Sequence, residues 1–543
     1  MKFLITIMFG MIFPALFAQQ IKREMIIRKK YLNLPIESSQ KQQKMVLKIP
    51  GHEDRDFVIR LSEGRPDYWV FNDVSDFLGK TIEILYPQEV EGINDIYQSD
   101  EIEGADSLYK ERNRPQFHFT TKRGWTNDPN GLVYYKGEYH LFYQHNPYER
   151  KWENMHWGHA VSKDLLHWTE LPIVLYPDKL GVMASGSAVV DISNTSGFQS
   201  GKEALIVAAY TCTSPDKQVQ CIAYSNDCGR TFTKYTGNPV IDSKEKWNTI
   251  NSRDPKIFWH KETNRWIMAL YEKTGISFYN SFNLKDWFFQ SHIGGFIECP
   301  ELFELAVDGN PKNKKWVLYG AAGTYLIGSF DGKTFTSETD KLCYFRGNMY
   351  AAQTYNNVPD GRRIQIGWGQ IEQKGMPFNQ MMLFPTELSL RSTRDGIRMF
   401  SEPIREIGRL HGKVQKWENL SSEELNEKLK SVRGNTFHIK MRIKLEDGGN
   451  FQFLYNGNPI LTYSIGDHYL NNAFYGGDKI EDLTFYYEVL IDKTSIELFA
   501  DHGKFSIISP QEAPKNGNGF EFNNWSKLLI EDFEIYEIKS IWE

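Results

Sequence analysis

Three acidic residues far apart in the chain share one local pattern. Asp128 lies in N-D-P-N-G, Asp254 in S-R-D-P-K and Glu298 in E-C-P-E-L-F. Each acid stands at or just before a proline that leads into an apolar, strand-forming segment. Turn chemistry alone could explain such positions, because Asn, Asp, Pro and Gly each favour turns for a separate reason. If the three segments are equivalent parts of a repeat, the three carboxylates instead meet in one cleft.

Carboxylates that lie a few ångströms apart repel each other, and the repulsion raises the pKa of one of them. Glycoside hydrolysis uses such a pair, in which one carboxylate attacks the sugar and the other carboxyl group protonates the leaving oxygen. Three acids could also bind calcium, but Arg253 beside Asp254 is an unfavourable neighbour for a cation. We therefore expect acid–base chemistry on a sugar, without a metal or a cofactor.

The elements that must position these acids follow from a repeat with a period of about 50–60 residues. Each unit has a short apolar strand that ends in Ser, then Asp or Asn, then an aromatic residue that begins the next strand. The four copies are S-K-D-L-L-H-W from Ser162, S-N-D-C-G-R-T-F from Ser225, S-F-N-L-K-D-W from Ser281 and S-F-D-G-K-T-F from Ser329. A recurring hairpin turn with about four strands per period is typical of a β-propeller.

A fifth unit without the Ser-Asp turn follows, with strands expected over 350–355, 363–369 and 388–391. We therefore predict a five-bladed propeller; a β-sandwich with chance similarity between its turns is the alternative. In a propeller the first strand of each blade lines the central channel. The three acids take this position in blades one, three and four, and A-S-G-S-A-V, from Ala184 to Val189, takes it in blade two.

The remaining segments also predict an all-β protein. Residues 1–18 have Lys2 before an apolar run that ends at Ala18, which is typical of a signal peptide. Residues 19–110 alternate as in a small N-terminal β-domain, and the acidic stretch from Asp95 to Asp106 is expected to be a linker. The propeller takes residues 111–405. Residues 410–543, with alternating strands and turns rich in Gly and Asn, predict a C-terminal β-sandwich.

Composition excludes several classes of partner. A net charge of −6 offers no basic field for nucleic acid. No stretch after the leader approaches the length of a membrane span, and no cysteine follows the leader to carry a lipid anchor. We expect an exported protein, periplasmic or extracellular, that is a monomer or a small homo-oligomer. Five cysteines do not make a disulfide framework, although Cys212 and Cys221 could pair across a hairpin.

Six motifs carry a resemblance to a known family. W-T-N-D-P-N-G, Y-Q-H-N-P, W-G-H-A-V-S-K-D-L-L-H-W, S-G-S-A-V, R-D-P and E-C-P occur in the order seen in glycoside hydrolase family 32. The chain resembles this family from Phe117 to about Leu390, and L-I-D-K-T-S-I-E-L-F, from Leu490 to Phe499, resembles the family's β-sandwich. The family contains invertases, inulinases and levanases. The resemblance implies a five-bladed propeller followed by a sandwich.

The resemblance also implies a role for each matching residue. Asp128 matches the nucleophile that forms a covalent fructosyl–enzyme intermediate, and Glu298 matches the general acid/base. Asp254 matches the residue that holds fructose hydroxyls and stabilises the transition state, and Arg253 should bind sugar and tune the acid/base. The positions expected around the terminal fructose are Asn127, Gln144, Trp152 and Ser185, with Trp368 as an aromatic wall from blade five.

These features predict a retaining β-fructosidase that acts on levan, inulin or fructo-oligosaccharides, with sucrose as a further candidate. An exo mode is preferred, because a propeller funnel with a closed floor suits a chain end. Ala184 stands where related enzymes often carry Phe, and together with the N-terminal module it keeps an endo-acting levanase as the alternative. Thr126 replaces the Met or Leu that is common in the first motif, and we expect this change to be harmless. A fructosyltransferase would use the same residues, and a non-catalytic fructan-binding protein is the alternative from another class.

Overall fold

The computed structural model describes residues 21–445, 449–464, 469–471, 473–474, 483–512, 519–525 and 527–542. The predicted signal peptide, residues 1–18, lies outside the described residues. The chain folds as two compact units that divide between Glu103 and Gly104. In the described part of the chain, no helix has the length and apolar character needed to cross a membrane.

The first unit consists of two antiparallel sheets. One has the strand order β1-β6-β3-β4 and the other β5-β2-β7. The strands are β1 Ile21–Ile26, β2 Tyr31–Ile36, β3 Gln43–Lys48, β4 Arg55–Ile59, β5 Tyr68–Asp73, β6 Thr81–Tyr86 and β7 Tyr97–Ser99, with a short helix, α1, at Glu91–Asp95. β7 lies within the acidic stretch that we predicted to be a linker, and it pairs with β2. That part of the linker prediction is wrong, because Tyr97–Ser99 completes a sheet.

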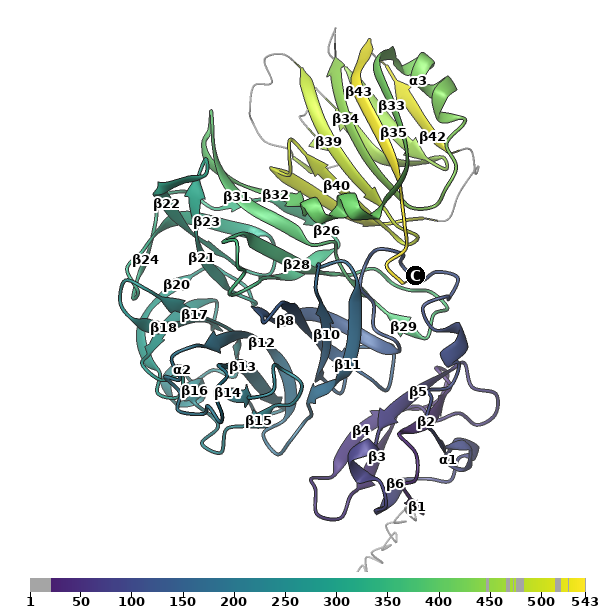
Figure 1. Ribbon diagram of the computed structural model, residues 1–543, viewed down its shortest axis with the longest axis vertical. Coiled ribbons are helices and arrows are strands. Elements are labelled where there is room, and N and C mark those ends of the chain that lie inside the picture. The colour runs from purple at the N-terminus through teal and green to yellow at the C-terminus, as the bar shows by residue number, and fades with distance from the viewer. Residues whose placement is uncertain are drawn as a thin grey trace, which may run out of the picture. The chain divides into compact units, whose positions relative to one another are not determined.

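The second unit begins with the propeller, whose blades form a ring around a central axis (Figure 1). The five-bladed prediction is confirmed, and the alternative of a β-sandwich in this region is wrong. Blade one is β8 Gly124–Tyr135, β9 Glu138–Asn146, β10 His156–Ser162 and β11 Trp168–Leu175. Blade two is β12 Val182–Asp191, β13 Leu205–Ser214, β14 Lys217–Ser225, β15 Thr233–Lys234 and β16 Ile241–Asp242. Blade three is β17 Ser252–His260, β18 Arg265–Glu272, β19 Gly275–Ser281 and β20 Phe288–Gly294, preceded by helix α2 at Ser243–Trp247.

Blades four and five share one sheet, because β21 pairs with β31 through a single parallel bridge between Val307 and Leu390. Blade four is β21 Glu301–Val307, β22 Asn310–Tyr319, β23 Thr324–Phe330, β24 Phe335–Ser337 and β25 Leu342–Cys343. Blade five is β27 Met349–Thr354, β28 Arg363–Gly369, β31 Thr386–Thr393 and β32 Gly396–Pro403, with the short strand β30 Met381–Met382 paired to β28. The short strand β29 Phe378–Asn379 pairs with β8 of blade one.

The repeated Ser-Asp segments form the turn between the third and fourth strands of the first four blades. In the first three copies the serine hydroxyl donates to the side chain two residues later, from Ser162 to Asp164, from Ser225 to Asp227 and from Ser281 to Asn283. These acceptors also take backbone N–H groups of the turn. The motif is therefore a side-chain-locked turn, which explains its recurrence without any role in chemistry.

The C-terminal sandwich packs a seven-stranded sheet on a five-stranded one (Figure 1, yellow-green). The first has the order β26-β41-β40-β39-β34-β43-β33 and the second β38-β37-β36-β35-β42. The strands are β26 Phe345–Gly347, β33 His411–Ser421, β34 Phe437–Leu445, β35 Asn450–Tyr455, β36 Asn458–Ser464, β37 Tyr469–Leu470, β38 Ala473–Phe474, β39 Thr484–Ile491, β40 Ser495–Ala500, β41 Phe505–Pro510, β42 Phe520–Asn524 and β43 Leu528–Ile538. Helix α3, Ser422–Leu429, begins with a capping box between Ser421 and Glu424.

All five cysteines are free thiols. Cys212 lies opposite Val219, and Cys221 lies opposite Tyr210, so the two cysteines are diagonal neighbours on β13 and β14. The pairing that the sequence allowed between them is therefore not formed in this structure.

Candidate active site

Bulges interrupt the inner strands of the propeller at one end of the axis. The strand ladder shifts register between Thr126 and Pro129 in β8, Met183 and Gly186 in β12, Arg253 and Lys256 in β17, and Tyr350 and Gln353 in β27. A bulge leaves a residue out of the ladder and re-aims its side chain, and bulges are common next to active sites. Asp128, Ser185 and Asp254 are among the residues that these bulges free from regular pairing.

In blade four the backbone is irregular just before the first strand, so a side chain is re-aimed there as well. Glu298 and Cys299 both have a left-handed backbone, with φ of 44° and 39°, and β21 begins at Glu301. Asp254 also has a left-handed backbone, with φ of 64°. Residues other than glycine pay for this conformation, and such strain collects at functional sites.

The three predicted acids converge around Cys299. Its thiol lies 3.5 Å from Oδ2 of Asp128 and 3.6 Å from Oδ2 of Asp254. Its backbone N–H donates to the same oxygen of Asp254 at 3.0 Å. Because Glu298 is the preceding residue, three blades bring their carboxylates to one place. In the described part of the chain, no group of three His, Cys, Asp or Glu side chains is arranged to hold a metal ion.

Asp128 is held by its two predicted neighbours. Ser185 donates its hydroxyl to Oδ2 at 2.7 Å, and the Asn127 amide donates to Oδ1 at 3.1 Å. Burial raises the pKa of Asp128, the hydrogen bonds lower it, and the charge of Glu298 raises it further. The net pKa shift is upward, so ionising this carboxylate costs free energy. The hydrogen bonds reduce that cost.

Asp254 is the most perturbed of the acids. It is 6% exposed, and burial together with the charge of Asp128 raises its pKa to about 7, although Arg253 and the N–H of Cys299 lower it. Thr211 Oγ1 accepts the Asp254 backbone N–H at 2.9 Å, which fixes the bulge. Asp254 therefore changes its protonation state near neutral pH.

Glu298 receives a hydrogen bond on each oxygen. Arg253 Nη2 donates to Oε1 at 2.5 Å, and the Tyr350 hydroxyl donates to Oε2 at 2.7 Å. Burial raises the pKa of Tyr350, and Glu298 raises it further, so the phenol keeps its proton. The Arg253 guanidinium lies 4.8 Å from the ring centre of Tyr271, a cation–π contact that helps to hold it.

An aromatic wall connects Asn127 with blade five. The indole N–H of Trp125 donates to Oδ1 of Asn127 at 2.9 Å. The rings of Trp125 and Trp368 meet edge to face, with 6.1 Å between their centres. The centres of the Tyr350 and Trp368 rings lie 6.2 Å apart. Trp368 is held by a bond from its N–H to Gln380. The predicted wall residue therefore touches a hydrogen-bond partner of Glu298.

Two predicted binding residues stand apart from this network. Gln144, on β9, is 2% exposed, and its amide Nε2 has no hydrogen-bond partner among the described residues. Trp152, in the segment between β9 and β10, is 56% exposed. The structure thus links Asn127, Ser185, Arg253 and Trp368 to the acids through its contacts, and leaves Trp152 open to a bound molecule or to solvent.

Cys299, Tyr350 and Trp125 were missed as site residues from the sequence. Cys299 is visible in E-C-P and Trp125 in W-T-N-D-P-N-G, but neither suggests chemistry by its type. Tyr350 was placed only as the start of a blade-five strand. A signal exists for Tyr350, since it lies at the start of the inner strand of the last blade and directly before its bulge, as Arg253 does in blade three.

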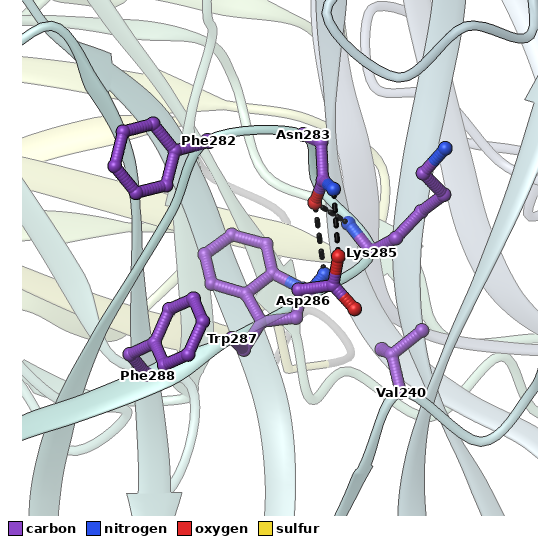
Figure 2. A pocket seen from close by; sticks show the side chains of 7 residues that line it. All are labelled: Val240, Phe282, Asn283, Lys285, Asp286, Trp287 and Phe288. Atoms are coloured by element: carbon purple, nitrogen blue, oxygen red, sulfur yellow. Dashed lines mark hydrogen bonds between the residues drawn. The ribbon is translucent and has the colours of Figure 1, made fainter.

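A separate cavity of about 460 Å³ lies at the Ser-Asn turn of blade three (Figure 2). The rings of Phe282 and Phe288 stand at its edge, beside the turn residues Asn283 and Asp286. Asn283 accepts the backbone N–H groups of Lys285 and Asp286 and donates to the Asp286 carboxylate. Its polar atoms therefore serve the turn, and none of the three acids lines this cavity.

Residues 118–403 match the family described as glycosyl hydrolases family 32, N-terminal domain. Together with the five-bladed propeller and its cluster of acids, this match defines the class. The chain belongs to glycoside hydrolase family 32, and it is a glycoside hydrolase.

Relatives from bacteria and fungi agree with this assignment. The chain is 38% identical over 491 residues to a levanase of Bacillus subtilis (strain 168), covering 80% of this chain and 72% of the relative. It is 32% identical to an extracellular exo-inulinase of Aspergillus niger, covering 75% of this chain and 91% of the relative. The crystal structure of an exo-inulinase from Aspergillus awamori superposes with a TM-score of 0.70 at 27% identity, over 80% of this chain and all of the other.

Proposed function

We propose that the protein is a retaining β-fructosidase. The Asp128 carboxylate attacks the anomeric carbon of a terminal fructose, and the bond from that carbon to the leaving oxygen breaks as Glu298 gives this oxygen its proton. Water then attacks the same carbon, Glu298 takes the water's proton, and the ester bond to Asp128 breaks. Asp254 holds fructose hydroxyls and stabilises the charge that develops on the sugar.

The observation that carries this proposal is the convergence of three carboxylates from three blades on Cys299. Burial and the neighbouring carboxylates raise the pKa values of Asp128 and Asp254 and cost stability, and such perturbed groups collect at functional sites. The different surroundings of the acids also separate their roles: Asp128 accepts from Ser185 and Asn127, whereas Glu298 lies between Arg253 and Tyr350.

The terminal fructose lies, in this proposal, among the residues next to Asp128. Asn127 and Ser185 orient the nucleophile, and Arg253 binds sugar and tunes Glu298. The buried Gln144 amide offers an unused donor, which suits a sugar hydroxyl. Trp152 and Trp368 supply ring faces for the sugar's C–H groups.

An exo mode is supported by the floor of the funnel. Below the acids the axis holds buried polar side chains, from Asn130, Ser187, Lys256, Glu301, Gln353 and Thr354. Ser187 donates to Pro255 O and accepts from Ile257, so blades two and three are sealed by hydrogen bonds. A channel closed at this level admits the end of a chain and stops it.

The substrates proposed are levan, inulin and fructo-oligosaccharides, with sucrose as a further candidate. The names of the relatives, levanase and exo-inulinase, support this class of substrate. Export to the periplasm or the medium is proposed from the predicted leader, and the extracellular location named for the Aspergillus niger relative agrees with it.

A product time course on levan and inulin in parallel tests the proposal. Free fructose as the sole early product from one polymer is the expected result, and it names the preferred linkage, β-2,6 or β-2,1. An oligosaccharide ladder would replace the exo mode by an endo-acting levanase, and longer oligosaccharides from sucrose would indicate a fructosyltransferase. Binding without turnover of polymers, short oligosaccharides or sucrose would overturn the enzymatic proposal.

A further inference from the structure

A second polar triad lies on the propeller axis next to the acids. Lys256 Nζ forms an ion pair with Glu301 Oε1 at 2.8 Å, and it also donates to the backbone oxygen of Thr354 at 2.7 Å. The Thr354 hydroxyl donates to the other Glu301 oxygen, Oε2, at 2.6 Å. Lys256 is 2% exposed, and Glu301 and Thr354 are fully buried. These three residues, called here the axial clamp, join blades three, four and five.

The axial clamp repeats the arrangement around Glu298. In both layers a cation from blade three and a hydroxyl from blade five bind the two oxygens of a carboxylate from blade four. Above, the members are Arg253, Glu298 and Tyr350; below, they are Lys256, Glu301 and Thr354. Each lower residue follows its upper counterpart by three or four positions on the same segment.

The lower layer also marks where regular pairing resumes. Lys256 is the first paired residue after the β17 bulge, Glu301 is the first residue of β21, and Thr354 directly follows the first paired residue after the β27 bulge. The bulged tips that carry Arg253, Glu298 and Tyr350 therefore begin at the clamp. Glu298 itself lies before the paired residues of β21, and its backbone carbonyl accepts one hydrogen bond, from the N–H of Ala321 at 3.0 Å.

We propose that Lys256, Glu301 and Thr354 are positioning residues that set the height and spacing of Arg253, Glu298 and Tyr350, and thereby aim Glu298 at the leaving oxygen. This inference rests on the proposed function, because it gives Glu298 the role of general acid. A buried ion pair is weak evidence for stability, since desolvation offsets the attraction, and fixing a unique geometry is a better-supported use. A shift of about 1 Å in a catalytic group costs roughly a hundredfold in rate.

The test compares two substrates that differ in their need for an acid. A natural fructoside such as sucrose has an alkoxide leaving group, which must be protonated as the bond breaks. An aryl β-fructofuranoside with a nitrophenolate leaving group needs no proton. The kcat/KM value reports the first irreversible step, so the ratio of kcat/KM values on the two substrates isolates acid catalysis. Glu298→Gln sets the reference for a lost acid.

Thr354→Val is the main variant, because it removes the hydroxyl from Glu301 at nearly constant volume and leaves the ion pair in place. We expect kcat/KM to fall by about tenfold to a hundredfold on sucrose and by less than about threefold on the aryl fructoside. Thr354→Ser keeps the hydroxyl and should restore both values. Glu301→Gln should show the same preference for the activated substrate, if it folds.

Thr386→Val is the matched control. Thr386 is a buried threonine of the same blade whose hydroxyl accepts from Ser401, away from the clamp. It should lower the melting temperature about as much as Thr354→Val while leaving the substrate ratio unchanged. A structural role alone would make the two valine variants alike.

The possible outcomes distinguish a failure of the axial-clamp proposal from a failure of the proposed function. If Glu298→Gln loses activity equally on both substrates, the role of Glu298 as acid is wrong. If Glu298→Gln spares the aryl fructoside but Thr354→Val lowers both substrates equally, or neither, the clamp does not position the acid. Failure of Thr354→Ser to restore the ratio would also overturn the inference.

Discussion

Burial and repulsion within the acid cluster make the protonation of Asp254 depend on folding. Burial and the charge of Asp128 raise the pKa of Asp254 to about 7, far above its ordinary value near 4. A carboxyl group with a raised pKa takes up a proton in the folded state before the unfolded chain does so. Between about pH 4 and pH 7 the folded state thus binds more protons, and stability falls as the pH rises through this window.

Asp254→Asn should therefore stabilise the protein, and more at pH 8 than at pH 5. Asparagine keeps an oxygen for the Cys299 N–H but carries no charge, so the cost of the charge disappears. Each pKa unit of the shift corresponds to about 1.4 kcal/mol at high pH. Thermal unfolding of the variant and the parent at the two pH values measures the effect.

Asp331→Asn provides a control of opposite sign. Backbone N–H groups of Thr334 and Lys333 lower the pKa of Asp331, so its charge stabilises the turn and the variant should lose stability at pH 8. An equal gain for Asp254→Asn at both pH values would contradict the explanation by charge.

Loss of either carboxylate that we propose to react should strongly lower turnover without unfolding the protein. Glu298→Gln is expected to lower kcat on sucrose by about 10²–10⁴-fold, the usual contribution of a general acid or base. Asp128→Asn should lower kcat at least as far, because the amide cannot form the covalent intermediate. Near-normal turnover by Asp128→Asn, with a melting temperature like that of the parent, would show that the mechanism is wrong.

At the scale of elements, the bulges of the inner strands depend on close backbone contacts. A Cβ atom on Gly186, in β12 beside Ser185, would lie 2.0 Å from the Ala209 carbonyl oxygen. A change of side-chain rotamer cannot relieve this overlap, because the atoms that the Cβ would meet belong to the backbone of β13. The close packing of β12 on β13 therefore holds Ser185 against Asp128.

Gly186→Ala should destabilise the protein by at least about 1–3 kcal/mol, the usual cost of overpacking. Gly294→Ala is the matched variant, because Gly294 also lies in a blade strand but a Cβ there has nothing within 4 Å. Chemical denaturation of both variants checks the difference. Equal free energies of unfolding would show that β12 adjusts its backbone without cost.

The sequence predicts the elements better than the irregularities within them. The Ser-Asp turns are visible because each combines an acceptor side chain with an aromatic at the start of the next strand. Asp128, Asp254 and Glu298 could be grouped because they share a place relative to a proline. The bulges could not be predicted, since the register shift at Arg253 depends on where β18 pairs.

At the scale of the whole second unit, a buried charge triad joins propeller and sandwich. His118 Nδ1 lies 2.8 Å from Asp492 Oδ2, and its Nε2 lies 2.5 Å from Glu497 Oε1. Burial lowers the pKa of His118, but the bonds to Asp492 and Glu497 outweigh this and raise the pKa to about 9. β26, which precedes blade five, also joins the sandwich by pairing with β41.

His118→Gln should therefore cost more stability at pH 6 than at pH 9.5. The raised pKa of the histidine stabilises the fold fully below its unfolded pKa of about 6.5, and this contribution is lost as the pH rises through about 9. Breaking a buried ion pair costs about 3–5 kcal/mol. Thermal unfolding at the two pH values provides the measurement.

His167→Gln is the surface control for this experiment. His167 pairs with Asp164 at 2.9 Å, but it is half exposed, so its loss should change the melting temperature little. If His118→Gln lowers the melting temperature equally at both pH values, the charge of His118 does not join the domains.

Contacts between side chains of different blades could not be predicted from the sequence. Tyr350 and Glu298 lie on different blades, and only closure of the ring brings the phenol to the carboxylate. The same holds for Lys256 and Glu301, whose types suggest an ordinary surface pair until both prove to be buried on the axis. The family resemblance supplied roles for matching residues, but it named no partner for Glu298 from blade five.

The covalent step is the central claim, and it can be observed directly. Glu298→Gln, incubated with a nitrophenyl β-fructofuranoside, should form the intermediate and resolve it slowly, because the general base for water is missing. Peptide mass spectrometry after acid quenching should find one fructosyl group on the peptide that contains Asp128. Release of nitrophenol without any adduct, or an adduct on another residue, would contradict a retaining mechanism at Asp128.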